Sequence, residues 1–285
     1  VLRPIKAMEA HGVQHTIVDC LPEGSLEMSK IEEAIRPETK LIVCTQASNV
    51  TGTILPTEEI GKLSRSRGIL FMVDGAQGAG HMEMNVKNVD LLAVPGHKGL
   101  LGPLGTGMLY VRDGIQLHSL IEGGTGTASK DMGQPLDVPE GYESGTVNAP
   151  GIIGLGFSAE FVRKVGISAI EDHECALLIP FDHALRNMQH VSVYGPEDPV
   201  DKVGITAFNI DGYSCEEVGA ILNDEYGIAV RGGYHCAGLA HRAIGTWECG
   251  AVRLSVGPYN TEEHINSAID AIYRIARSGS RQSQG

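Results

Sequence analysis

The amino-acid sequence predicts an α/β protein with a mostly parallel sheet, followed by a smaller α+β domain. In the first half of the chain, short apolar runs alternate with segments of helical periodicity, and in the second half this alternation stops. Of the 285 residues, 42% are hydrophobic and 20% are charged. This composition is sufficient to bury a core and excludes wholesale disorder.

The expected strands of the first half are short and apolar. They lie at residues 15–20, 41–45, 69–74, 91–94 and 107–112. One helix is expected at residues 25–35, with Ser25 as its N-cap, and another from Pro56 to about Arg67, where Gly68 ends it. Helices between apolar strands indicate a sheet that is covered on both faces.

The second half has a different organisation. A loop rich in Gly, Thr and Pro is expected at residues 122–148, and a largely helical segment follows at 150–188. Strands are then expected at residues 191–194, 203–210, 228–231 and 251–256, helices at 215–224 and 261–275, and a frayed polar tail at 277–285. We therefore expect a large domain of residues 1–165 and a small domain of residues 166–285.

Charge and cysteine content narrow the class of protein. The net charge of −13 argues against nucleic acid or an anionic membrane as the default partner. The apolar runs are far shorter than the ~18 residues of a membrane-spanning helix, and no secretion leader opens the chain. The six cysteines show no zinc-ligand spacing, so we expect no metal site and free thiols in the cytoplasm. Because Val1 replaces the usual Met, we also expect a missing N-terminal segment.

Polar residues follow the expected strands, where open α/β sheets bind ligands. Asn49 follows one strand, Asp74 and Gln77 the next, and His97 and Lys98 the one after that. Taken alone, Asp74 is more commonly a cap or an ion-pair partner, and Lys98 a solvated lysine. Together, a carboxylate that can hold a pyridinium and a lysine that can hold an aldehyde are the two groups that pyridoxal phosphate chemistry requires.

Two segments, Asp74-Gly75-Ala76-Gln77 and Gly96-His97-Lys98-Gly99-Leu100-Leu101-Gly102-Pro103, resemble the class V aminotransferase family. The resemblance continues through residues 143–148, 231–236 and 253–261, and it is greatest to the cysteine desulfurases and selenocysteine lyases. It covers nearly the whole chain. It implies a PLP-transferase large domain of the seven-stranded type, here without its N-terminal part, and a small C-terminal domain.

The resemblance also implies a role for each polar residue around pyridoxal 5'-phosphate. Lys98 binds the cofactor aldehyde and Asp74 pairs with the pyridine nitrogen. Gln77 hydrogen-bonds the phenolic oxygen, and His97 contacts the phosphate. Asn49 lies near the ring oxygen and the substrate carboxylate.

Three further residues complete the implied site. Arg253 holds the substrate carboxylate, for which a guanidinium fork is well suited. Thr125 and Thr127 lie in a loop that resembles one reaching the phosphate of a neighbouring subunit. The resemblance therefore implies a homodimer with sites at the subunit interface.

Cys236 indicates the branch of the family. It lies beside His235 and five residues after Arg231, and positive neighbours favour a thiolate. A buried, inert cysteine is the commoner case, but the surrounding motif favours a reactive one. The resemblance implies that Cys236 attacks the sulfur of L-cysteine. The products are L-alanine and a persulfide on Cys236, which then passes to an acceptor protein.

Alternatives remain open at this point. One is an aminotransferase or another lyase that does not use the cysteine, and another is an inactive truncated homologue. Pro95 stands where family members often carry Ser or Thr, so one phosphate contact is lost. The family's upstream phosphate loop and ring-stacking aromatic residue would precede Val1. Cysteine and selenocysteine are not distinguished, and His81 shows no partner pattern and is expected to be structural.

Overall fold

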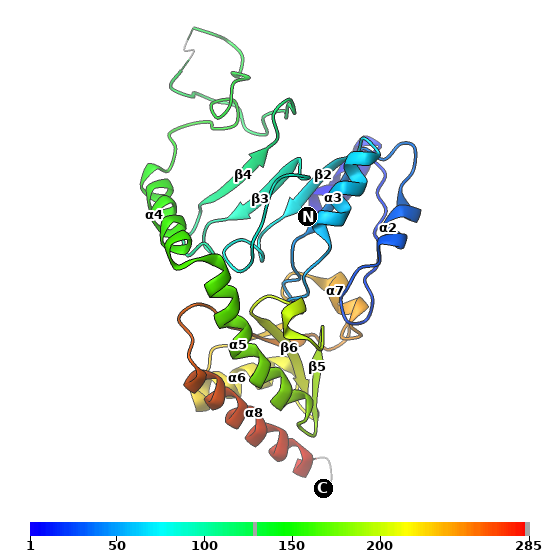
Figure 1. Ribbon diagram of the computed structural model, residues 1–285, viewed down its shortest axis with the longest axis vertical. Helices are drawn as coiled ribbons and strands as arrows, with labels where there is room; N and C mark the ends of the chain where they lie inside the picture. Colours follow the sequence, from blue (N-terminus) through cyan, green and yellow to red (C-terminus); the bar gives the residue numbers. More distant parts are fainter. Residues whose placement is uncertain (128–129, 283–285) are drawn as a thin grey trace.

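The computed structural model describes residues 1–127 and 130–282 and contains two four-stranded sheets (Figure 1). The first sheet has the order β1 (Leu41–Thr45), β2 (Leu70–Asp74), β3 (Leu91–Pro95) and β4 (Gly107–Val111). The first three strands are parallel, and β4 runs antiparallel to β3. The predicted α/β class is confirmed, with four strands in this sheet among the described residues.

The parallel register aligns the carboxyl ends of the strands. Thr45 pairs with Asp74, and Asp74 pairs with Ala93, so the loops after these strands leave from one edge of the sheet. Helix α3 (Thr57–Ser66) covers the sheet, and its Ile60 packs in one core cluster with Phe71 of β2. The sheet is thus held by apolar burial, while its polar loops remain free for a ligand.

The second half forms an antiparallel sheet with helices. Its strand order is β5 (Val191–Tyr194), β6 (Ile205–Ile210), β8 (Ala251–Ser255) and β7 (Arg231–Gly233). Its longer helices are α4 (Ala149–Val165), α5 (Ile167–Arg186), α6 (Cys215–Tyr226) and α8 (Glu262–Gln282). Phe181, Phe208, Leu222 and Ile272 form its core, and all four are fully buried. Gly166, with φ of 93°, separates α4 from α5. We propose domains of residues 1–165 and 166–285 on this basis.

Two expected elements near the N-terminus are wrong. Residues 15–20 form no strand, because no described strand lies beside them to complete a ladder. The expected helix at 25–35 is shorter, and α2 spans Met28–Ala34. Ser25 does not cap it, because its hydroxyl donates to the Glu23 carboxylate at 2.7 Å.

Other differences concern element ends and short helices. A strand was expected at 228–231, but the observed strand β7 spans Arg231–Gly233, where it pairs with β8. The tail expected to fray at 277–285 is helical to residue 282 as the end of α8, and 283–285 lie outside the described residues. The sequence analysis missed four short helices, namely α1 (Leu2–Met8), η1 (Glu9–His11), η2 (Pro199–Asp201) and α7 (Gly238–Ala243).

The loop after β1 joins the first sheet to the second half of the chain. Ile54 N–H donates to the Asp201 carbonyl at 2.8 Å, and Val203 N–H donates to the Gly52 carbonyl at 3.0 Å. Beside this ladder, the fully buried amine of Lys202 forms an ion pair with Asp182 of α5, which also accepts from Thr206 at 2.6 Å. Because this ion pair is buried, loss of either charge is expected to destabilise the contact between the first sheet and the second half of the chain.

Asp182→Asn is expected to lower the free energy of unfolding by about 3 kcal/mol, because it leaves the Lys202 ammonium buried without a counter-charge. Urea unfolding followed by circular dichroism measures this loss. Asp172→Asn is the matched control, since Asp172 is exposed on the same helix, and it is expected to cost less than about 1 kcal/mol. Equal losses in the two variants would contradict the prediction.

Candidate active site

Asp74 and Lys98 lie at the carboxyl edge of the first sheet. Asp74 is the last residue of β2, and its Oδ1 accepts from Ala76 N–H at 3.0 Å. Lys98 follows the end of β3 and is half-buried. Burial lowers the pKa of the Lys98 amine, and the Asp74 carboxylate acts in the opposite direction. The structure therefore brings the two residues within electrostatic range of each other.

Glycines fix the Lys98 loop against the loop that follows Asp74. A Cβ on Gly99 would overlap the Ala79 carbonyl oxygen, and a Cβ on Gly80 would overlap the Gly99 carbonyl group. Gly80 also has φ of 84°, a conformation that favours glycine. The two loops can approach this closely only because both positions lack a side chain.

The second sheet contributes Cys236 and two arginines. Arg231 of β7 pairs with Arg253 of β8 in the antiparallel register. Arg231 Nη2 lies 3.9 Å from Cys236 Sγ, and the Cys236 side chain is exposed. The charges of Cys236 and Arg253 also act on the Lys98 amine. Groups from both sheets therefore converge on one place.

The turn that presents Cys236 is strained. His235 and Cys236 have φ of 51° and 63°, so two consecutive residues with side chains adopt the left-handed conformation. The His235 side chain is 2% exposed, and its Nε2 lies 2.9 Å from the Ala251 carbonyl oxygen. The His235 carbonyl accepts from Asn49 Nδ2 at 2.6 Å. These two contacts hold the turn through the His235 ring and through its carbonyl group.

Asn49 also contacts Arg253. Arg253 Nη1 donates to the Asn49 carbonyl at 2.9 Å, and burial lowers the pKa of the guanidinium. Arg253 Nε is buried and has no hydrogen-bond partner among the described residues. An unpaired buried N–H is costly unless a ligand completes it. The Arg253 Nε–H is therefore a donor that an acidic ligand group could satisfy.

Of the other predicted residues, Gln77 and His97 lie in the loops that follow β2 and β3, whereas Thr125 and Thr127 lie outside this cluster. Gln77 is half-buried and His97 is exposed, and neither side chain forms a hydrogen bond within the described residues. Thr125 and Thr127 lie in the loop between β4 and α4, which extends away from both sheets (Figure 1). Their hydroxyls are 3.1 Å from each other, so within one chain these threonines do not reach the site.

The other cysteines differ from Cys236 in their surroundings. Burial raises the pKa of Cys44 to about 12 and that of Cys215 to about 11. Burial also raises the pKa of Cys20. Cys249 is exposed, but its Sγ contacts Asn209 Nδ2 at 3.6 Å and no arginine among the described residues. Cys236 is therefore the exposed thiol with a guanidinium beside it.

The sequence analysis missed two contacts at this site. The first is the buried anchor formed by His235. The second is the partner of His81, because His81 Nδ1 lies 2.9 Å from Oε1 of Glu174. This partner lies 93 residues away in the chain, so spacing alone does not reveal it.

The chain belongs to the class V aminotransferase family, whose model matches residues 1–267. It is 36% identical to a probable cysteine desulfurase from Methanothermobacter thermautotrophicus, covering 97% of this chain and 70% of the relative. It is 32% identical to a cysteine desulfurase from Serratia proteamaculans, covering 90% of this chain and 63% of the relative. The chain thus spans 63–70% of the length of these relatives.

Solved structures agree with the family assignment. The apo structure of cysteine desulfurase from Thermococcus onnurineus NA1 superposes with a TM-score of 0.86 at 32% identity. The superposition covers 98% of this chain and 70% of that structure. A second structure, described as a NifS-like protein, gives a TM-score of 0.82 at 25% identity, covering 96% of this chain and 71% of that one.

Pyridoxal 5'-phosphate is the cofactor of this family, and the residues present fit it. The half-buried Lys98 amine has a lowered pKa, which suits capture of an aldehyde. The amine forms no hydrogen bond or ion pair within the described part of the chain. Asp74 supplies a carboxylate at the end of its strand. Arg253 has an unpaired Nε, and its charge contributes to the lowered pKa of Lys98.

The buried His235 predicts a pH dependence of stability. Burial, with the charge of Arg253, lowers the pKa of His235 from 6.5 to about 4. The unfolded chain therefore binds a proton before the folded chain does, and stability falls as the pH drops below 6.5. Between pH 7 and pH 5 this group alone is expected to cost about 2 kcal/mol.

Urea unfolding of the parent protein and of His235→Asn at pH 7 and pH 5 measures this effect. The variant is expected to lose less stability than the parent over that interval, because asparagine does not titrate. His11→Asn is the control, since His11 is exposed and its replacement is expected to leave the pH dependence unchanged. The same slope in the parent and in His235→Asn would contradict the assignment.

Proposed function

We propose that this chain is a PLP-dependent cysteine desulfurase that converts L-cysteine to L-alanine and forms a persulfide on Cys236. The observation that carries the proposal is the contact between the turn that bears Cys236 and the carboxyl edge of the first sheet: the His235 carbonyl accepts from Asn49 Nδ2 at 2.6 Å, and Arg231 Nη2 lies 3.9 Å from Cys236 Sγ. A thiol at this place is required for a desulfurase and unnecessary for a transaminase. The relatives' names support the same reaction.

In this proposal the residues of the first sheet hold the cofactor. Lys98 binds its aldehyde, Asp74 its pyridine nitrogen, Gln77 its phenolic oxygen and His97 its phosphate. When bound, pyridoxal 5'-phosphate supplies an electron sink for the bonds at the substrate Cα. Because burial lowers the pKa of the Lys98 amine, the free amine is available to accept the Cα proton.

Arg253 and Asn49 bind the substrate carboxylate in this proposal. Arg253 Nη1 is already occupied by the Asn49 carbonyl, while Nε is buried and unpaired. A carboxylate that accepts from Nε restores the missing hydrogen bond and neutralises a guanidinium whose charge is partly desolvated. This pairing fixes the position of the amino acid relative to Cys236.

Cys236 takes the sulfur. Its thiolate attacks the substrate Sγ, so that the new S–S bond forms as the Cβ–Sγ bond breaks. The electron pair of the broken bond stays with carbon and is protonated, which gives the methyl group of alanine. Arg231, 3.9 Å from Cys236 Sγ, stabilises the negative charge on the sulfur before and after transfer.

The proposal also includes a cytoplasmic location for the protein and transfer of the sulfur to an acceptor protein. All six cysteines are free thiols, and free thiols are typical of proteins of the reducing cytoplasm. No described helix is long and apolar enough to cross a membrane. Because Cys236 is exposed, its persulfide can be handed directly to an acceptor protein.

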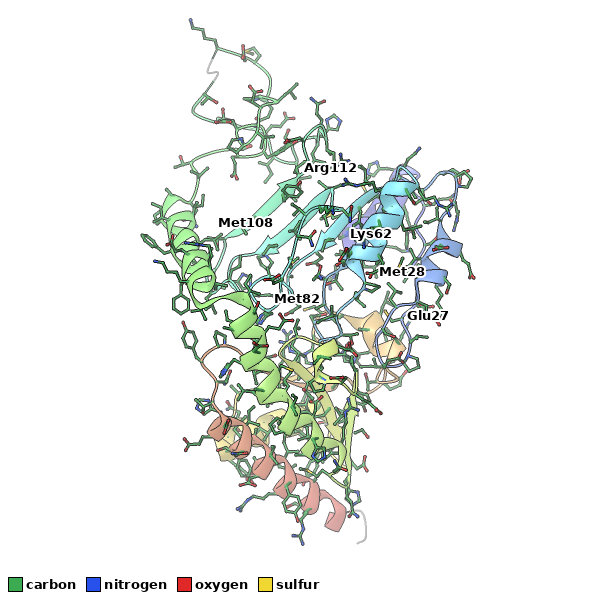
Figure 2. All side chains as sticks on the ribbon, in the orientation of Figure 1. Glu27, Met28, Lys62, Met82, Met108 and Arg112 are labelled. Carbon is green, nitrogen blue, oxygen red and sulfur yellow. The ribbon has the colours of Figure 1, made fainter. Side chains whose placement is uncertain are left out.

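We further propose a homodimer that covers an apolar face on β4 and α4. Met108 of β4 is 51% exposed, and Ile153 and Phe157 of α4 are 60% and 76% exposed. Met108 is labelled in Figure 2 on β4, the strand nearest α4. A second copy would bury this face, and its loop would bring Thr125 and Thr127 to the cofactor phosphate of the first subunit.

Purified protein supplied with pyridoxal 5'-phosphate, L-cysteine and a dithiol, which reduces the persulfide on Cys236 to the thiol and sulfide, is expected to release alanine and sulfide in equal amounts. Cys236→Ser is expected to keep the visible absorbance of bound cofactor and to lose at least about 100-fold in sulfide release, because the nucleophile is gone. Lys98→Ala is expected to lose the absorbance band as well. Absorbance spectra and sulfide assays measure these outcomes.

Cys249→Ser is the matched control, since Cys249 is a second exposed cysteine, and it is expected to behave like the parent. Full sulfide release by Cys236→Ser would overturn the desulfurase proposal. Amino-group transfer to a 2-oxo acid without sulfide would indicate an aminotransferase instead.

Phe157→Asp is expected to convert the dimer to a monomer, because it places a carboxylate in the centre of the proposed interface. Light scattering coupled to size-exclusion chromatography measures the mass of the species. Ile179→Asp is the control, since Ile179 is 50% exposed on α5 and outside this face. A parent protein that is already monomeric would contradict the proposed assembly.

A further inference from the structure

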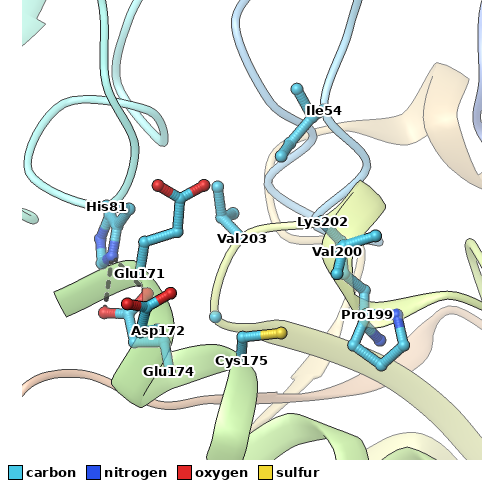
Figure 3. Close-up of a pocket in the computed structure, with 11 residues that line it drawn as sticks. Ile54, His81, Glu171, Asp172, Glu174, Cys175, Pro199, Val200, Lys202 and Val203 are labelled. Atoms are coloured by element: carbon cyan, nitrogen blue, oxygen red, sulfur yellow. Dashed lines mark hydrogen bonds and ion pairs between the residues drawn. The ribbon is translucent and has the colours of Figure 1, made fainter. Parts of the chain in front are cut away.

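His81 links the loop after β2 to helix α5. Its Nδ1 lies 2.9 Å and 3.0 Å from the two carboxylate oxygens of Glu174 (Figure 3). The Glu174 side chain is 3% exposed and the His81 side chain 17% exposed. This is an ion pair between the first sheet's loops and the first helix of the small domain.

The surroundings of Glu174 are acidic and polar. Glu171, Asp172 and Cys175 line the same pocket of about 140 Å³, which Figure 3 shows between α5 and the loops. Lys202 also lines this pocket, but Asp182 already pairs with its amine. Among the described residues, His81 Nδ1 is therefore the side-chain partner of the buried Glu174 carboxylate, which is costly to leave unpaired.

The other edge of the His81 ring lies against Gly99. A Cβ on Gly99 would be 2.6 Å from His81 Cδ2 and 2.7 Å from Nε2, so the imidazole fills the space beside this glycine. Gly99 is the residue after Lys98. A continuous series of contacts thus runs from Glu174 through His81 to the backbone that carries the reactive amine.

This series of contacts joins the two parts of the site. Lys98 follows a strand of the first sheet, whereas Cys236 and Arg253 belong to the second sheet. The core of the second sheet contains residues of α5, so α5 is fixed to the sheet that bears Cys236. A displacement of about 1 Å between catalytic groups can cost roughly 100-fold in rate.

We propose that His81 and Glu174 are positioning residues that anchor the Lys98 loop to α5 and so hold Lys98 in register with Cys236 and Arg253. The catalytic consequence of this anchor rests on the proposed desulfurase function, whereas the anchor itself does not. Neither residue touches the substrate in this proposal. Their role is to keep the loop in place.

The anchor is tested first in protein free of cofactor. Glu174→Ala and His81→Asn each remove one side of the ion pair, and both are expected to accelerate amide hydrogen exchange in residues 96–102 about tenfold. The same variants are expected to change the rate at which acetic anhydride modifies Lys98, read by mass spectrometry. Glu171→Ala is the matched control, because Glu171 lies one turn earlier on α5 and does not contact His81.

The second test uses enzyme loaded with pyridoxal 5'-phosphate. Both variants are expected to lower kcat for sulfide release roughly 10- to 100-fold and to leave KM for L-cysteine unchanged, because Arg253 is untouched. The absorbance maximum of the bound cofactor is expected to shift, whereas Glu171→Ala behaves like the parent. If Glu174→Ala does not fold, His81→Asn tests the same contact from the more exposed side.

The outcomes separate the two proposals. Unchanged hydrogen exchange in both variants, or an equal change in Glu171→Ala, would overturn the anchor whatever the activity. Faster exchange in both variants, with no sulfide release even from the parent, would support the anchor and reject the desulfurase. A rise in KM at constant kcat would also overturn the positioning role.

Discussion

The proposed chemistry depends on the junction between two sheets, and Asn49 is the residue that joins their reactive parts. Its side chain donates to the His235 carbonyl, and its own carbonyl accepts from Arg253. Asn49 follows β1, whereas the other two residues belong to the second sheet and its turn. One residue that follows a strand of the first sheet therefore contacts both Arg253, the arginine proposed to bind the substrate carboxylate, and the turn that carries Cys236.

The junction also explains how a strained turn persists. Two consecutive left-handed residues cost of order 1–3 kcal/mol each, and an exposed turn has few contacts with which to offset this. Here His235 buries its ring and bonds the Ala251 carbonyl, while Asn49 holds the His235 carbonyl. The strain is confined to the backbone, and the Cys236 side chain remains exposed and beside Arg231.

Local sequence signals predicted much of the fold, and long-range contacts account for what they missed. The strand at residues 41–45 and the helix ended by Gly68 were predicted almost to the residue, because apolar runs and a terminating glycine act locally. Ser25 was wrongly assigned as a cap because a hydroxyl can bond a neighbouring carboxylate instead. Whether a serine caps a helix depends on competing local acceptors, which periodicity does not reveal.

The same distinction applies to the site. Asp74 and Lys98 were recognisable because each follows a strand, and parallel strands bring such residues to one edge. Glu174 and Asn49 act across 93 and 186 residues of chain, and no spacing rule connects them to their partners. Sequence reasoning therefore named the candidate reactive groups and Asn49, whereas the contacts of Asn49 and the Glu174 partner of His81 appeared only with the folded chain.

The position of Lys98 also determines its chemistry. Burial lowers the pKa of the amine, and the nearby Asp74 carboxylate raises it. The balance depends on how far the loop is withdrawn from solvent and how close it lies to the first sheet's edge. Because Gly99 packs against both Ala79 and His81, this loop has little freedom to shift without losing contacts. Contacts on both sides of the loop therefore restrict the position of the amine and, with it, the burial that lowers the pKa of the amine.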